Sequence, residues 1–153
     1  MLPRATAIIA AYNAVNELPT SIAAAQCQSD VQMEIIVADD ASPDATPALM
    51  ERYPDVVYRR LEQNGGPSAA RNAAIDAATG DWIAVLDADD TMTPGRLAAM
   101  IALAEEKDAD ILLGNFRRVD DRGEPIDDAP YLDPATLDTN TPLSAEDYVG
   151  HNQ

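Results

Sequence analysis

Short apolar runs alternate with longer segments of mixed polarity along most of the chain. The apolar runs are typical of strands and cover Ala5–Ala11, Met33–Ala38, Val56–Leu61, Trp82–Leu86 and Asp110–Val119. The segments between them predict helices over Asn16–Gln28, after a Ser42 cap with Pro43 at the first position, over Pro67–Ala78 and from Thr93 to Lys107. This alternation predicts an α/β fold with a mostly parallel central sheet.

Polar residues follow three of the predicted strands directly. Tyr12-Asn13 follows the first strand, Asp39-Asp40 the second, and Asp87-Ala88-Asp89-Asp90 the fourth. The carboxyl ends of parallel strands meet at one edge of a sheet, and ligands of such folds bind beyond that edge. The sequence therefore predicts a binding site built from these three strand ends.

The charge of the chain limits the ligands that this site can take. Ten Lys and Arg stand against 27 Asp and Glu, a net charge of −17. Such a surface repels nucleic acid and anionic lipid, so an anionic ligand needs a divalent cation or a well-placed arginine. Cys27 is the one cysteine, which suits a reducing cytoplasm. No apolar run approaches the roughly 20 residues that span a bilayer.

The two acidic strand ends allow different chemistry. Asp87 and Asp89, at i and i+2 after a strand, can turn toward one hard cation such as Mg²⁺ or Mn²⁺. The alternative is a solvated acidic loop without a ligand. Asp40 can accept the imide N–H of a base or a ribose hydroxyl, or it can cap the following helix together with Ser42.

The stretch Gly65-Gly66-Pro67-Ser68-Ala69-Ala70-Arg71-Asn72 is the most distinctive of the chain. Its glycines permit a tight turn, and Pro67 is favourable at the first position of a helix. Arg71 then lies in the first turns of that helix and points toward the strand ends. Its guanidinium can contact a base or a phosphate, or pair structurally with Asp40 or Asp87.

These motifs together resemble a known family. Ile8–Asn13, Val37–Ser42, Gly65–Asn72 and Leu86–Asp90 occur in the order found in family 2 of the inverting glycosyltransferases, and the resemblance covers about residues 5 to 105. It implies the GT-A fold, a Rossmann-like three-layer α/β/α arrangement. Within the family, the chain is most similar to bacterial enzymes of exopolysaccharide assembly, such as succinoglycan-type transferases.

The resemblance implies that a sugar passes with inversion from a nucleotide-diphosphate sugar, a UDP-sugar being favoured, to a hydroxyl of a saccharide or lipid-linked saccharide. It also implies Mn²⁺ or Mg²⁺ as cofactor. Tyr12 would stack on the base, Asp40 would accept from it with Asp39 beside it, and Arg71 would hold the base end. Asp87 would lie near ribose and metal, and Asp89 would bind the metal. The remaining residues expected at the nucleotide are Ala10, Asn13 and Ala88.

The chain also departs from the family pattern. The family often has Pro or Thr at the position of Ala10 and Gly at that of Ala41, and we expect altered loops with retained binding. The base that activates the acceptor is expected beyond Gln153, with Glu146 and Asp147 as a second candidate pair that comes early for the role. We therefore expect residues 1–119 to form the donor-binding domain of a truncated enzyme, and residues 120–153 a loop-rich start of the acceptor side.

Two other functions are the alternatives to this interpretation. One is a nucleotide-binding fragment without turnover of its own. The other is a GT-A-like nucleotidyltransferase, which would need a glycine-rich loop and basic residues after the first strand, where Ala10–Val15 has neither. For the transferase itself we expect a cytoplasmic protein, either free or peripheral at the inner face of the plasma membrane.

Overall fold

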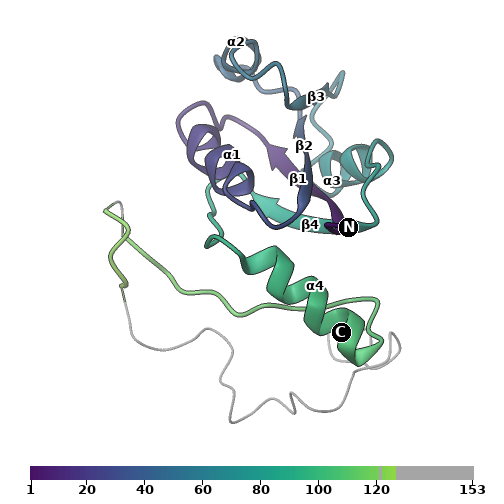
Figure 1. Cartoon of the computed structure of the whole chain (residues 1–153). Helices are drawn as coiled ribbons and strands as arrows, with labels where there is room; N and C mark the ends of the chain where they lie inside the picture. Colours follow the sequence, from purple (N-terminus) through teal and green to yellow (C-terminus); the bar gives the residue numbers. More distant parts are fainter. Residues whose placement is uncertain (121, 127–153) are drawn as a thin grey trace, which may run out of the picture. The chain divides into compact units, whose positions relative to one another are not determined.

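The computed structural model describes residues 1–120 and 122–126, and residues Met1–Ile101 form one of its two units. This unit contains a parallel sheet in the order β3-β2-β1-β4 (Figure 1). The strands are β1 (Arg4–Ala11), β2 (Gln32–Asp39), β3 (Val57–Arg60) and β4 (Trp82–Asp87). The helices are α1 (Leu18–Gln26), α2 (Thr46–Met50), α3 (Pro67–Ile75) and α4 (Arg96–Lys107), the last of which continues past Ile101.

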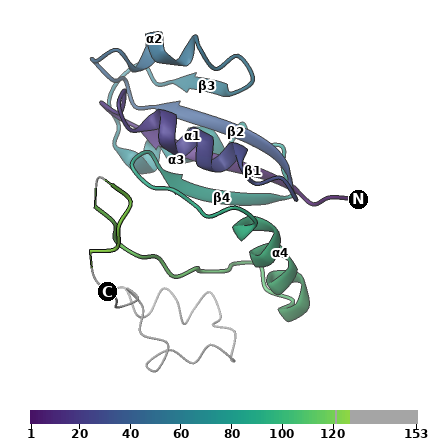
Figure 2. The same ribbon diagram turned by 60° about the vertical axis from the view of Figure 1, so that its left-hand side comes forward.

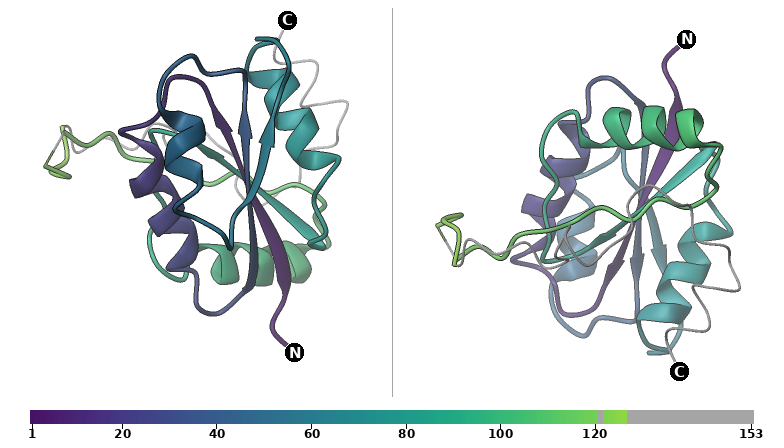
Figure 3. Two further views of the ribbon diagram at one scale, coloured as in Figure 1. Left: turned by 90° about the horizontal axis from the view of Figure 1, so that it is seen from above. Right: turned by 90° about the horizontal axis from the view of Figure 1, so that it is seen from below.

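β1 lies inside the sheet, and both of its faces are covered. Ile9 packs in a core with Leu18 and Ile22 of α1, while the neighbouring Ile8 packs on the other face with Ala70 of α3. Figures 2 and 3 show α1 and α3 on opposite sides of the strands. A strand buried on both faces reads as a continuous apolar run, as this one does. The predicted three-layer α/β/α architecture is confirmed.

The predicted first four strands are all present, with ends that differ by at most one residue, but three of the four helix starts differ by two or three residues. The helix predicted to begin at Pro43 begins instead at Thr46. Ser42 does not cap it, because the Ser42 N–H is bonded to Asp39 Oδ1 and the Ser42 Oγ accepts from the Asn13 N–H. These long-range bonds outcompete the local cap that the sequence favoured.

Register brings the predicted polar strand ends to one edge. Ala11 at the end of β1 lies opposite Asp39 of β2, and Ala10 lies opposite Asp87 of β4. The opposite edge is held by Gly80, which precedes β4. A Cβ on this glycine would lie 2.6 Å from the Thr6 nitrogen, so the α3–β4 connection passes close to β1 only because the residue is glycine.

The second unit, from Ala102 onward, contains the end of α4 and little regular structure in its described residues. The strand predicted over Asp110–Val119 is wrong: within the described residues this segment forms a single bridge, between Val119 and Pro125. A strand requires a hydrogen-bonded neighbour, which a sequence pattern alone does not supply. The turn predicted from Asp120 to Pro125 is confirmed by a bond from the Asp120 N–H to the Glu124 carbonyl.

Helices of the described ranges are too short or too polar to cross a bilayer.

Candidate functional site

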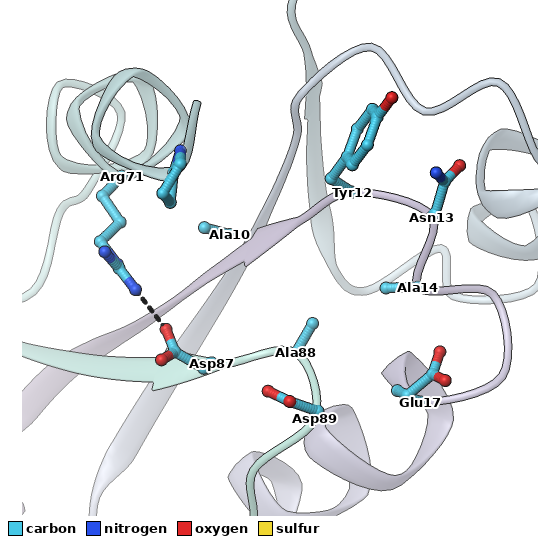
Figure 4. A pocket seen from close by; sticks show the side chains of 10 residues that line it. Ala10, Tyr12, Asn13, Ala14, Glu17, Arg71, Asp87, Ala88 and Asp89 are labelled. Carbon is cyan, nitrogen blue, oxygen red and sulfur yellow. Dashed lines mark hydrogen bonds and ion pairs between the residues drawn. The ribbon is translucent and has the colours of Figure 1, made fainter. Parts of the chain in front are cut away.

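A cavity of about 380 Å³ lies beyond the carboxyl ends of β1 and β4 (Figure 4). Three segments line it: the loop after β1, the first turns of α3, and the loop after β4. Seven residues predicted at the site meet there, namely Ala10, Tyr12, Asn13, Arg71, Asp87, Ala88 and Asp89. The convergence follows from the parallel register, since each of these loops leaves the sheet at the same edge.

Arg71 reaches from α3 to the end of β4. Its Nη2 lies 2.5 Å from Asp87 Oδ1, and both side chains remain part-exposed, at 34% and 49% (Figure 4). The structural pairing that the sequence left open is thus present. An ion pair this accessible to water contributes only about 0–1 kcal/mol to folding. Both groups still face the cavity, so the pair leaves a guanidinium and a carboxylate in reach of a ligand.

The loop after β4 concentrates negative charge. Asp89 and Asp90 are exposed, and Asp89 lines the cavity together with Asp87. Partial desolvation of its carboxyl raises the pKa of Asp90 above its ordinary value of 3.8, although most of the side chain is exposed, and the charges of Asp89 and Asp87 raise it further. This repulsion is what a cation bound at the loop would relieve.

A metal at this loop would be shared with a ligand. Among the residues that the structure describes, no group of three or more His, Cys, Asp and Glu could hold a metal ion by itself. Asp87 and Asp89 nonetheless offer hard carboxylate oxygens. Mg²⁺ is usually bound by one or two carboxylates, with substrate phosphates and waters as its other ligands. The donor set therefore fits a divalent cation that binds together with a phosphorylated ligand.

A second cavity, of about 340 Å³, lies beside the first and shares Ala10, Tyr12 and Pro67 with it. Its other lining residues are Ala11, Asp40, Asn64, Gly66 and Ala70. Tyr12 lines both cavities, and its side chain is half-exposed. An exposed aromatic ring between two connected hollows is suited to stack on a flat ligand group.

Asp40 is only 3% exposed and already has protein partners. Its Oδ1 accepts from the Gly65 N–H at 2.8 Å and its Oδ2 from the Gly66 N–H at 2.7 Å. It thereby fixes the turn before α3, where Gly66 has a φ of 84° that favours glycine. The alternative of Asp40 as a cap of the following helix is wrong, since its carboxylate holds this other turn.

Asp39 lies outside both cavities. Its side chain is fully buried and accepts from Ser42 N at 2.8 Å, from the Tyr58 hydroxyl at 2.5 Å and from Arg60 Nη1 at 2.7 Å. Burial and the hydrogen bond to Asp39 raise the pKa of Tyr58 to about 12. A direct contact between Asp39 and a nucleotide is thus not available to its carboxylate in this structure.

Several residues of the site were missed by the sequence reasoning. Tyr58 and Arg60 stand at i and i+2 of β3, which places both on one face beside the end of β2, and this alternation was the signal that could have found them. Glu17 and Asn64 line the cavities but carry no such signal. Glu146 and Asp147, the second candidates for the base, lie outside the described residues.

Gln28, also missed, supports the loop after β4 from behind. It is almost fully buried. Its Nε2 donates to the Thr93 carbonyl at 2.9 Å, and its Oε1 accepts from the Leu97 N–H at 3.2 Å. The far end of the acidic loop is therefore tied to the segment that follows α1, while the end that carries Asp89 is free of such bonds in the described part of the chain.

The chain belongs to glycosyl transferase family 2, whose model matches residues 6–151. It is 47% identical over 117 residues to the succinoglycan biosynthesis protein ExoO of Rhizobium meliloti, a match that covers 75% of this chain and 34% of that protein. It is 31% identical over 125 residues to the poly(ribitol-phosphate) beta-N-acetylglucosaminyltransferase TarS of Staphylococcus aureus, covering 77% of this chain and 22% of that one.

The fold is also that of solved members. The structure of S. aureus TarS 1–349 in complex with UDP matches with a TM-score of 0.70 and 29% identity, over 80% of this chain and 38% of that chain. The complex of the same protein with UDP-GlcNAc matches with a TM-score of 0.69 over 80% and 37%. The expected GT-A fold and the resemblance to succinoglycan enzymes are confirmed. The chain spans about a third of the length of several of these relatives.

Proposed function

We propose that this chain binds a nucleotide-diphosphate sugar, a UDP-sugar in the first place, as the donor half of an inverting glycosyltransferase of polysaccharide biosynthesis. The observation that carries the proposal is the meeting of Tyr12, Arg71, Asp87 and Asp89 around one cavity at the strand ends. Its volume, about 380 Å³, lies within the range of roughly 300–1,000 Å³ common for small-molecule sites. The complexes of TarS with UDP and UDP-GlcNAc support the choice of ligand.

The base of the nucleotide is proposed to enter the second cavity and stack on Tyr12. Asp40 faces this cavity, and each carboxylate oxygen has lone pairs for more than one donor. It can therefore accept the imide N–H of uracil while it holds the Gly65 and Gly66 amides. Asp39 is then beside the base site without touching the base, and Arg71, which lines the larger cavity, is proposed to hold the nucleotide where the two cavities meet.

The ribose and the diphosphate are proposed to occupy the larger cavity, along Ala10, Asn13, Asp87 and Ala88. Mn²⁺ or Mg²⁺ would be held there by Asp89, with Asp87 beside it. Once bound, such a cation offsets the charge of the nucleotide diphosphate that leaves the sugar. The protein's own contribution is to place the donor between the Arg71 cation and these carboxylates, at a fixed edge of the sheet.

The transfer itself requires a general base that takes the proton of the acceptor hydroxyl. None of the described residues of the two cavities is assigned this role, and the base is proposed to lie outside them. The acceptor is proposed to be a saccharide or a lipid-linked saccharide, and the enzyme to act in the cytoplasm, free or at the inner face of the plasma membrane. The exopolysaccharide context follows from the similarity to the succinoglycan protein.

Calorimetric titration of UDP into the purified chain, with and without Mn²⁺, tests the proposal. We expect Mn²⁺-dependent binding that Asp89→Ala abolishes. Asp81→Ala is the matched control, because it removes an exposed carboxylate at the other end of β4, and it should bind as the unmodified chain does. Failure of UDP, GDP and dTDP alike to bind under any metal would contradict the proposal.

A second candidate function is donor binding without turnover by this chain alone. It is favoured by the extent of the match, about a third of the length of the succinoglycan relative. Both functions predict the same titration. Release of UDP that depends on an added saccharide acceptor separates them, since hydrolysis of the donor by water releases UDP without an acceptor and only transfer requires one.

A further inference from the structure

The loop after β1, which carries Tyr12 and Asn13, adopts a backbone conformation that needs support. Asn13 has a φ of 54°, in the left-handed region that residues other than glycine adopt infrequently. Ala41, in the loop after β2, has a φ of 58°. Such positions cost of order 1–3 kcal/mol each and persist when neighbouring contacts hold them. The two loops lie side by side, so contacts between them determine the shape of the cavity wall.

Ser42 makes the contact between these two loops that reaches Asn13 itself. Its Oγ accepts from the Asn13 N–H at 3.0 Å. A second, longer bond runs from the Val15 N–H to Asp44 Oδ2 at 3.3 Å. The position of Asn13, and of Tyr12 before it, therefore depends on where the loop after β2 holds Ser42.

Ser42 is in turn held at both ends of its backbone. Its N–H donates to Asp39 Oδ1 at 2.8 Å, and its carbonyl accepts from Arg60 Nη2 at 2.9 Å. Arg60 also donates to Asp39, and the Tyr58 hydroxyl gives the same carboxylate a third donor. Because Asp39 is fully buried and takes three donors, it fixes Ser42 more tightly than a solvated side chain could.

We propose that Asp39, with Tyr58 and Arg60 of β3, is a positioning residue that sets the Tyr12–Asn13 wall of the cavity through Ser42. The proposal rests on the proposed function where it concerns nucleotide affinity. Its structural part, that a change at Asp39 moves Asn13, does not. Asp39 then acts on the ligand indirectly, through Ser42 and Asn13, although its own carboxylate lines neither cavity.

The first test needs no nucleotide. In the ¹⁵N-labelled chain, Asp39→Asn and Tyr58→Phe should shift the Asn13 amide resonance in the direction that Ser42→Ala shifts it, although neither residue is bonded to Asn13. Tyr58→Phe is the milder change, in case Asp39→Asn does not fold. Thr6→Val is the matched control: Thr6 is equally buried, and its hydroxyl accepts the Gly80 N–H at the other end of the sheet. An Asn13 amide that stays unmoved in both β2 and β3 variants would overturn the proposal.

The second test is the affinity for UDP with Mn²⁺ present. Ser42→Ala and Tyr58→Phe should each weaken binding about fivefold, the effect of one lost hydrogen bond. The UDP affinity of Thr6→Val should stay within about twofold of that of the unmodified chain. Its melting temperature should nevertheless fall about as much as that of Ser42→Ala. Equal losses of affinity in Thr6→Val and Ser42→Ala would mean a merely structural role and overturn the proposal. If the unmodified chain binds no nucleotide, the proposed function is contradicted instead. The Asn13 resonance would still show whether Asp39 sets the position of Asn13 through Ser42.

Discussion

The acidic residues after β2 and those after β4 lie at the same edge of the sheet in different surroundings. Asp39 and Asp40 are buried, and every one of their carboxylate oxygens accepts from the protein. Asp89 is exposed, and Asp87 has one oxygen bonded to Arg71. The first pair is held by the fold at every carboxylate oxygen, although Asp40 keeps lone pairs toward the second cavity, and the second pair has most of its oxygens without a protein donor in the described part of the chain.

The difference arises from what stands beside each strand end. β2 lies inside the sheet, so β3 brings Tyr58 and Arg60 to it and the turn before α3 brings two backbone amides. Among the described residues, β4 lies at the edge of the sheet and pairs with β1 alone. The cavity thus has one wall braced by neighbouring elements and one wall of loosely held carboxylates, which are free to adjust to a cation and its ligand.

The largest expected effect is a difference in the free energy of unfolding between a substitution at the end of β2 and one in the loop after β4. Asp39→Ala should lower the free energy of unfolding by about 3 kcal/mol, because it leaves Arg60, Tyr58 and an amide without their acceptor. Asp89→Ala should change it by less than about 0.5 kcal/mol, as is usual at an exposed site. Urea denaturation at pH 7 measures both. Equal losses would show that the braced and the open end do not differ.

The next effect concerns the turn before α3. Asp40→Ala should cost about 2 kcal/mol, since the Gly65 and Gly66 amides lose their shared carboxylate. Hydrogen exchange at these two amides should accelerate well beyond the change in global stability. Asp81→Ala, at an exposed position, provides the control and should leave both rates unaltered. If the Gly65 and Gly66 amides remain protected from exchange in Asp40→Ala, the turn does not depend on the Asp40 carboxylate.

The sequence was sufficient for the strands and for most of the open end of the site. Apolar runs located β1 to β4, because a buried strand can be recognised from the hydrophobic pattern of its own segment. The polar residues that follow β1 and β4 then marked Tyr12, Asn13, Asp87 and Asp89. Arg71 followed from the turn and proline before it. These features depend on local pattern and on the parallel arrangement of strands alone.

The braced end could not be predicted in the same way. The sequence does not show which groups hold Asp39 and Asp40 in place, because their partners come from β3 and from the turn before α3, far along the chain. Ser42 likewise reads as a helix cap until Asn13 occupies its hydroxyl. The strand predicted over 110–119 failed for a related reason, since pairing depends on a neighbour that no local pattern specifies.

The ion pair between Arg71 of α3 and Asp87 of β4 should matter little for folding but strongly for binding. Arg71→Met should change stability by less than about 1 kcal/mol, because the ion pair with Asp87 is part-exposed. UDP affinity should fall about tenfold, since the cavity of Figure 4 loses the one cationic residue among its described lining. Arg52→Met, an exposed arginine away from the cavity, is the matched control in both measurements. A comparable loss of affinity in the control would attribute the effect to net charge.

The smallest effect tests the electrostatic strain of the open end. Burial, then the charges of Asp89 and Asp87, raise the pKa of Asp90 in the folded protein, so the folded state binds more protons than the unfolded chain above pH 3.8. The contribution of Asp90 to stability therefore falls as pH rises through its raised pKa. Asp90→Asn should remove that fall and gain well under about 1 kcal/mol at pH 7, because the group is exposed to solvent.

Mn²⁺ turns the same variant into a test of where a cation binds. An ion among the carboxylates after β4 relieves their repulsion, so saturating Mn²⁺ should stabilise the unmodified chain and reduce the advantage of Asp90→Asn at pH 7. Mg²⁺ should act in the same direction, and NaCl at matched ionic strength controls for screening. Thermal unfolding of both chains between pH 4 and pH 8, with and without the metals, measures the difference. An advantage that Mn²⁺ leaves unchanged would place the cation away from this loop, and the contrast between a braced and a metal-ready strand end would then fail.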